Sequence, residues 1–226
     1  DDFIKIAKKR NLGLTAKQKF LAQLFISIAF VLALLYNGEI GTEIFIPFWN
    51  KSLDLGFLFI PFSVFIILGF VNGVNLTDGI DGLAGTVTLI VSIFLAVAAA
   101  LRYESSLTSV SLILAGGILG FLLYNLHPAK VFMGDTGSLF LGGYITAVSV
   151  LLGYELLLLF YGIIYLVETF SVIIQVASYK LTGKRVFKMS PIHHHFEMCG
   201  WRENKIVLVF SLVTVLFCIT SYFLIR

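Results

Sequence analysis

The chain has 226 residues, of which 58% are apolar and 13% are charged, with a formal net charge of +3. Globular domains usually carry about 25% charged residues, so these charges are too few to cover a water-exposed surface of this size. The mean hydropathy of +0.97 agrees with that conclusion. Soluble, disordered, collagen-like and disulfide-scaffold classes are therefore excluded, and an integral membrane protein remains.

Seven apolar runs approach the roughly 20 residues that a helix needs to cross a bilayer core. Because they are uninterrupted, they favour helices over barrel strands, whose residues alternate over about ten positions. The fifth run is short and rich in glycine, so it needs support from its neighbours. We expect an all-α membrane protein, a single polytopic domain over residues 1–226, with seven spans: Phe20–Tyr36, Phe57–Val71, Leu83–Leu101, Leu107–Leu123, Leu139–Leu152, Leu156–Tyr179 and Ile206–Ile225.

The basic residues predict how the chain is oriented in the membrane. On alternate connecting segments, 13 of the 16 Lys and Arg residues lie on one side, in residues 1–19, at Lys130 and in residues 180–205. Cytoplasmic loops carry such an excess of positive charge. The chain is therefore expected to start in the cytoplasm and to end outside. The extracytoplasmic segment 37–56 contains Pro47 and Gly56 and predicts a small hairpin.

Four polar motifs fall on the predicted cytoplasmic side. Glycines flank the acidic residues of two of them, and glycine lets a backbone approach a ligand closely. Both acidic turns come where a helix begins, a position that favours phosphate. Carboxylates repel phosphate unless a hard cation lies between them, and Mg²⁺ suits that role. The residues thus predict a Mg²⁺-dependent phosphoryl-transfer site, formed by Asp1-Asp2-Phe3-Ile4-Lys5, Asn72 to Gly82, Phe132 to Ser138, and Pro191 to Glu197.

Each motif also has a purely structural interpretation. Asp1 and Asp2 can form helical ion pairs with a nearby lysine, and Asp81 and Asp135 can cap the helices that follow them. The three adjacent histidines can be a tag remnant or an ordinary loop, and they do not easily converge on one zinc ion. Glu168 lies inside a predicted span and is costly there unless it faces a cavity or a partner. The combination of all four motifs favours the functional interpretation.

In this order, the motifs resemble those of the polyprenyl-phosphate phosphosugar transferases. The acidic motifs are shared across that superfamily. One motif is similar to that of the branch that transfers phospho-N-acetylmuramoyl-pentapeptide. It is the run His193-His194-His195-Phe-Glu197-x-x-Gly200-Trp201. The resemblance covers nearly the whole chain and implies a ten-span fold with both ends outside. It therefore implies three further spans before Asp1, and we expect residues 1–226 alone to be inactive.

The resemblance also implies a reaction. Undecaprenyl phosphate would attack the β-phosphate of UDP-N-acetylmuramoyl-pentapeptide, giving lipid I and UMP for peptidoglycan synthesis. This would occur at the cytoplasmic face of a bacterial plasma membrane, in a possible homodimer with membrane lipid as a partner and no nucleic acid. Mg²⁺ would be bound by Asp135. Asp1, Asp2, Asp135 and His194 would be catalytic, and the substrate cleft would contain Lys19, Asn75, Asp78, Asp81, Asn125, Phe132, Gln175, His193 and His195, with Phe132 stacking on uracil.

The mechanism and the substrate leave alternatives open. An aspartate of the first motif can act as a nucleophile, but an ionised lipid phosphate needs little activation. We therefore favour direct attack, with Asp2 facing the reacting atoms. The nearest rival is a transferase of N-acetylglucosamine-1-phosphate, against which the unbroken histidines argue. An ion-coupled transporter is a more distant alternative, because membrane carboxylates and histidines often form relays. Transporters place such groups near the bilayer midplane, whereas here all but Glu168 lie in loops or at span ends. A catalytically dead scaffold is a third.

Overall fold

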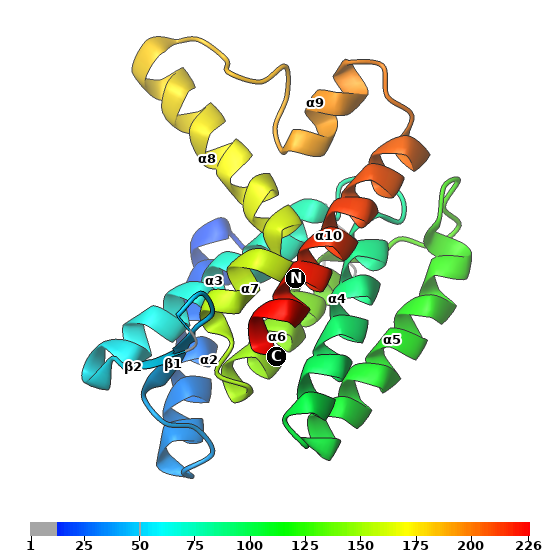
Figure 1. The fold of residues 1–226 in the computed structure, drawn as a ribbon. Coiled ribbons are helices and arrows are strands. Elements are labelled where there is room, and N and C mark those ends of the chain that lie inside the picture. Colours follow the sequence, from blue (N-terminus) through cyan, green and yellow to red (C-terminus); the bar gives the residue numbers. More distant parts are fainter. Residues whose placement is uncertain (1–12, 50) are drawn as a thin grey trace.

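The computed structural model describes residues 13–49 and 51–226. They form a bundle of helices with one small hairpin (Figure 1). The first described helix begins after Thr15, which forms a capping box with Gln18 and so satisfies free backbone N–H groups. The elements are α2 (Ala16–Tyr36), β1 (Glu43–Ile46), β2 (Lys51–Asp54), the 3-10 turn η1 (Gly56–Leu58), α3 (Phe59–Thr77), α4 (Leu83–Leu101), α5 (Ser105–Asn125), α6 (Gly134–Leu151), α7 (Glu155–Tyr161), α8 (Ile163–Thr182), α9 (Ile192–Met198) and α10 (Glu203–Ile225).

Six helices in the described part of the chain are long and apolar enough to cross a membrane. They are α2, α3 extended by η1, α4, α5, α8 and α10. This confirms a multi-pass, all-α membrane protein. The short run expected at Leu139–Leu152 forms α6, which has 18 residues, begins earlier at Gly134, and falls outside these six. The count of seven spans and the ten-span family fold therefore stay predictions.

The expected sixth span, Leu156–Tyr179, is not one continuous helix. Helix α7 ends and α8 begins at Gly162, whose φ of −94° and ψ of 18° depart from α-helical values. A Cβ at Gly162 would lie 2.5 Å from Phe70 Cε1 and 2.7 Å from the Leu158 carbonyl oxygen. Glycine is a poor helix former and permits this close packing. The helix breaks there, and α8 runs outward from the bundle (Figure 1).

The centre of the bundle is formed by α3, α4 and α6. Helix α4 is the most buried of the six long helices, whereas α2 is the least buried. Helices α3 and α6 approach closely at Gly142, where a Cβ would lie 2.7 Å from Val71 Cα. Hydroxyl groups inside the bundle bond to one another, as Thr88 does to Tyr165 at 2.8 Å. This packing fixes the ends of α3 and α6 relative to each other.

The predicted hairpin in residues 37–56 is confirmed. Strands β1 and β2 pair antiparallel, with Glu43 opposite Asp54 and Ile46 opposite Lys51. The ring of Phe45 in β1 packs against Tyr154, with 5.8 Å between ring centroids. Because Tyr154 follows the end of α6, the hairpin lies at the opposite end of α6 from the acidic motif at its start.

Candidate functional site

Hydrogen bonds join the α3–α4 turn, the α5–α6 loop and the start of α10 at one end of the bundle. The backbone N–H of Gly82 donates to Asn125 Oδ1 at 3.2 Å, and Asn125 Nδ2 donates to the Val131 carbonyl at 2.9 Å. The backbone N–H of Asp81 donates to Glu203 Oε2 at 3.1 Å. Motifs that are distant in sequence therefore meet at one end, as the order of the spans predicted.

Asp135 is the meeting point of three helices. It lies in the first turn of α6, where Lys19 Nζ from α2 donates to its Oδ2. Asn75 Nδ2 from α3 donates to its Oδ1 at 3.3 Å and to Ser138 Oγ at 2.8 Å. The side chain is still 27% exposed. The N-cap of α6 is Met133, so the capping interpretation of Asp135 is wrong, and its carboxylate is oriented toward other groups.

A second carboxylate lies close to Asp135. Asp78 is the C-cap of α3, and burial raises its pKa to about 7, with the charge of Asp135 acting in the same direction. Partial burial of two neighbouring carboxylates is unfavourable while both are ionised. A hard divalent cation that takes oxygen ligands would relieve that repulsion. The residues present therefore fit a Mg²⁺ ion held by Asp135 beside Asp78.

Asp81 does not cap α4, and the capping interpretation is wrong here too. The N-cap of α4 is Gly82, which makes no side-chain cap. Asp81 Oδ2 instead accepts from the Ala129 backbone N–H at 2.9 Å and lies 3.2 Å from His127 Nδ1. Its carboxylate is thus directed at the α5–α6 loop, where the Ala129 backbone N–H donates to it.

Sequence reasoning missed His127 and Glu203. Their ligand atoms and that of Asp81 lie within 4.8 Å of one another, so the three residues could hold a metal ion. His127 lies in the α5–α6 loop and Glu203 is the first residue of α10, and neither belongs to one of the four motifs that the sequence singled out. Mg²⁺ prefers carboxylate, carbonyl and water oxygens to imidazole. For this cation, the Asp78 and Asp135 carboxylates are the better fit.

The three histidines of α9 have three separate partners. His193 Nδ1 lies 3.0 Å from Glu168 Oε1, and both side chains are fully buried. His194 pairs with Glu197 through Nδ1, and His195 Nδ1 accepts from a loop backbone N–H. A substrate could reach His194 and His195 directly. Contact with His193 would require a local rearrangement of α9.

Gln175 is engaged with the backbone of the loop that follows α8. Its Oε1 accepts from the backbone N–H groups of Val186 and Phe187, each at 2.9 Å, and its Nε2 donates to the Phe187 carbonyl at 2.9 Å. In this arrangement the amide holds the loop against α8. Its predicted contact with a substrate stays a prediction.

Phe132 and an apolar cavity lie next to the polar cluster. Phe132 is 76% exposed at the end of the α5–α6 loop, so its ring can stack on a planar group.

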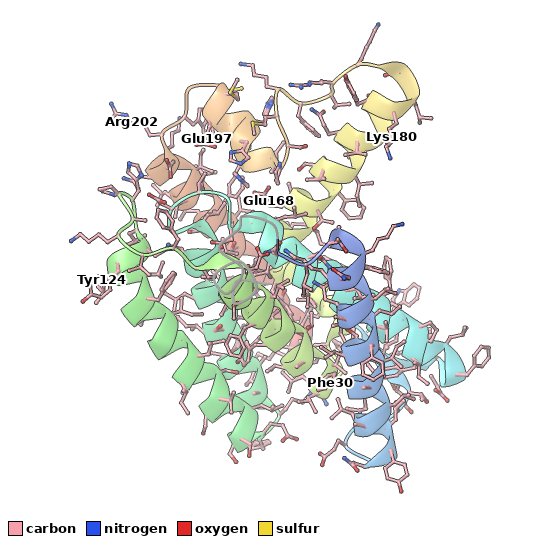
Figure 2. All side chains as sticks on the ribbon, turned by 180° about the vertical axis from the view of Figure 1, so that it is seen from behind. Phe30, Tyr124, Glu168, Lys180, Glu197 and Arg202 are labelled. Carbon is pink, nitrogen blue, oxygen red and sulfur yellow. The ribbon has the colours of Figure 1, made fainter. Side chains whose placement is uncertain are left out.

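The cavity has a volume of about 520 Å³ and lies between α2, α3 and α6. Phe30, labelled in Figure 2, is in its apolar lining, and Lys19 lies at its polar edge. Asp1 and Asp2 lie outside the described residues.

Comparison with known proteins shows which family the chain resembles over most of its length. The family model described as glycosyl transferase family 4 matches residues 1–153. Relatives from Caldanaerobacter subterraneus, Acetivibrio thermocellus and Clostridium perfringens are 52%, 51% and 52% identical over 223, 229 and 222 residues. These alignments cover 99%, 100% and 98% of this chain and 70%, 69% and 69% of the relatives. All three are named phospho-N-acetylmuramoyl-pentapeptide-transferase.

The chain belongs to the phospho-N-acetylmuramoyl-pentapeptide-transferase family. The resemblance inferred from the acidic and histidine motifs is therefore confirmed, and the protein is a membrane transferase. Membership in this family gives the polar cluster around Asp135 a chemical context, because the transferred group carries a phosphate.

Proposed function

We propose that this protein transfers phospho-N-acetylmuramoyl-pentapeptide from its UDP-linked donor to undecaprenyl phosphate. An oxygen of the acceptor phosphate forms a bond to the β-phosphorus of the donor. The bond from that phosphorus to the bridging oxygen breaks, and UMP leaves with the electron pair. The products are lipid I and UMP. Identity of about 52% over nearly the whole chain to transferases of this name carries the proposal.

The residues around Asp135 have separate tasks in this proposal. Asp135 would hold Mg²⁺ with Asp78 beside it, and the ion, when bound, would offset the negative charge of the phosphates. Lys19 and Asn75 hold the Asp135 carboxylate from two neighbouring helices. Because both contacts come from packed helices, the carboxylate is oriented before the substrate binds, which lowers the cost of positioning.

The remaining predicted residues define where the two substrates would bind. Asp81 lies in the α3–α4 turn, Asn125 ends α5, and the exposed ring of Phe132 lies in the α5–α6 loop. We assign the uridine part of the donor to these three residues. The apolar cavity beside Lys19 supports an acceptor that joins a charged phosphate to a long hydrocarbon chain. Asp1 and Asp2 are proposed to act beside the reacting phosphates, with direct attack by the lipid phosphate.

The proposed location is the bacterial plasma membrane, with the site on its cytoplasmic face. Six apolar helices support a multi-pass protein, and the excess of Lys and Arg on the motif side supports a cytoplasmic site. The homodimer implied by the resemblance is a further proposal. Light scattering of the purified protein, corrected for bound detergent, would measure that oligomeric state.

The substrate is tested by supplying one UDP-sugar at a time. The intact protein is incubated with undecaprenyl phosphate, Mg²⁺ and either UDP-N-acetylmuramoyl-pentapeptide or UDP-N-acetylglucosamine, and released UMP is measured. We expect the muramoyl donor to react at least about 10³-fold faster, a ratio that polar contacts to a substrate can supply. Equal or greater UMP release from UDP-N-acetylglucosamine would assign the protein to the rival reaction.

A further inference from the structure

Glu168 and His193 form a fully buried pair between α8 and α9. His193 Nδ1 and Glu168 Oε1 are 3.0 Å apart, and neither side chain has exposed surface. Figure 2 shows Glu168 beneath the short helix that carries Glu197. An isolated buried carboxylate is strongly destabilising, whereas a paired one is tolerated. The pair therefore explains how α8 accommodates an acidic residue in its interior.

The imidazole of His193 also packs directly on the turn that carries Asp78. A Cβ at Gly79 would lie 2.2 Å from His193 Nε2 and 2.7 Å from its Cε1. The ring thus occupies the space that a side chain at Gly79 would need. The ring of His194 lies on another side, with 4.1 Å between the two centroids. His193 consequently contacts α8, the acidic turn and His194 at once.

Two polar atoms of this pair remain without a partner. Glu168 Oε2 and His193 Nε2 are buried and make no hydrogen bond to the described residues. Unpaired buried polar atoms cost free energy, so a hydrophobic contact between α8 and α9 would stabilise the fold at least as well. The fold alone therefore gives little reason for a carboxylate and an imidazole here.

We propose that Glu168 and His193 are positioning residues, which hold the acidic turn and His194 in register with Asp135. Glu168 fixes the position of the His193 ring, and that ring sets how closely the turn at Gly79 approaches α9. Asp78 directly precedes Gly79 and faces Asp135. This inference rests on the proposed function, because it assigns the pair to the same transfer site.

The test compares two buried glutamates, Glu168 inside α8 and Glu155 at the start of α7. Glu168→Leu removes the bond to His193, and Glu168→Gln keeps an oxygen that can accept from Nδ1. Glu155→Leu is the matched control, since Glu155 is also fully buried but lies next to Tyr154, near the hairpin. UMP release from the muramoyl donor is measured for each intact variant, giving kcat and a separate KM for donor and acceptor, together with the thermal unfolding midpoint.

We expect Glu168→Leu to lower kcat/KM for the donor by about 10²-fold, the effect of misplacing reacting groups by about 1 Å. Glu168→Gln should recover activity to within about threefold of the unsubstituted protein, and the KM of the acceptor should not change. Glu155→Leu should keep kcat and both KM values. If Glu168→Leu does not fold, Gly79→Ala is the second test, because its Cβ forces the His193 ring and the acidic turn apart while both members of the pair stay in the chain.

The possible outcomes separate this inference from the proposed function. An unsubstituted protein that releases no UMP from the muramoyl donor would overturn the proposed function and the positioning role with it. An active protein whose Glu168→Leu or Gly79→Ala variant keeps full kcat/KM would overturn the positioning role alone. Equal losses in Glu168→Leu and Glu155→Leu would show that burial, rather than positioning, is what matters.

Discussion

Asp135→Asn is expected to abolish Mg²⁺-dependent turnover while the helical bundle stays folded. The carboxylate on α6 accepts from Lys19 of α2 and from Asn75 of α3, and it is partly exposed. An amide keeps the shape but loses the charge that a hard cation requires. We expect a loss of about 10³-fold or more in kcat, because charge stabilisation dominates phosphoryl transfer.

The matched control is Asp54→Asn in the hairpin at the other end of the bundle. Asp54 is also hydrogen-bonded, accepting from Gly56 N–H at 2.8 Å and from Thr42. UMP release is measured across a range of Mg²⁺ concentrations for both variants, with circular dichroism to check folding. Turnover of folded Asp135→Asn within tenfold of the unsubstituted protein would rule out Asp135 as the metal ligand.

Asp78→Asn is expected to remove most activity and to stabilise the fold. Burial, assisted by Asp135, raises the pKa of Asp78 from an ordinary value of 3.8 to about 7. Between these values the folded protein keeps the proton that the unfolded chain has released, so the free energy of unfolding falls as pH rises from about 4 to about 7. At pH 8 the neutral amide should raise stability by about 2 kcal/mol, since each pKa unit corresponds to about 1.4 kcal/mol and partial exposure reduces the effect.

The same shift predicts how pH and Mg²⁺ act on the unsubstituted protein. Activity should fall as pH decreases through about 7, because protonated Asp78 no longer supports a cation at Asp135. Higher Mg²⁺ concentration should move this acidic limb to lower pH, since cation and proton compete. An acidic limb that is independent of Mg²⁺, or an Asp78→Asn variant that is less stable at pH 8, would contradict the assignment.

Much of the fold could be predicted from the sequence. Uninterrupted apolar runs predicted helices whose ends lie within six residues of the expected spans, apart from the break at Gly162, and Pro47 with Gly56 predicted the hairpin. The order of the spans placed the acidic turns and the histidines at one end, where Asn125 and Asp81 join their loops. These features depend on local composition and on the rule that successive connecting segments lie on alternate sides of the membrane. Both can be read from a single sequence.

The partners of individual side chains could not be predicted. The break at Gly162 depends on the approach of Phe70 from another helix, and Asp81 bonds to a loop rather than to its own helix terminus. Gln175 holds a neighbouring loop, and Glu168 finds His193 across 25 residues. Such choices are made by tertiary packing, for which the sequence carries no periodic signal.

Membrane vesicles of known orientation test most directly whether the site around Asp135 faces the cytoplasm. Inside-out and right-side-out vesicles containing the intact protein are supplied from outside with UDP-N-acetylmuramoyl-pentapeptide and Mg²⁺, with undecaprenyl phosphate in the bilayer, and UMP is measured. The donor does not cross the membrane, so it reaches one face only. We expect UMP from inside-out vesicles and none from sealed right-side-out vesicles. UMP release by right-side-out vesicles alone would place the cluster around Asp135 on the outer face and contradict a cytoplasmic active site.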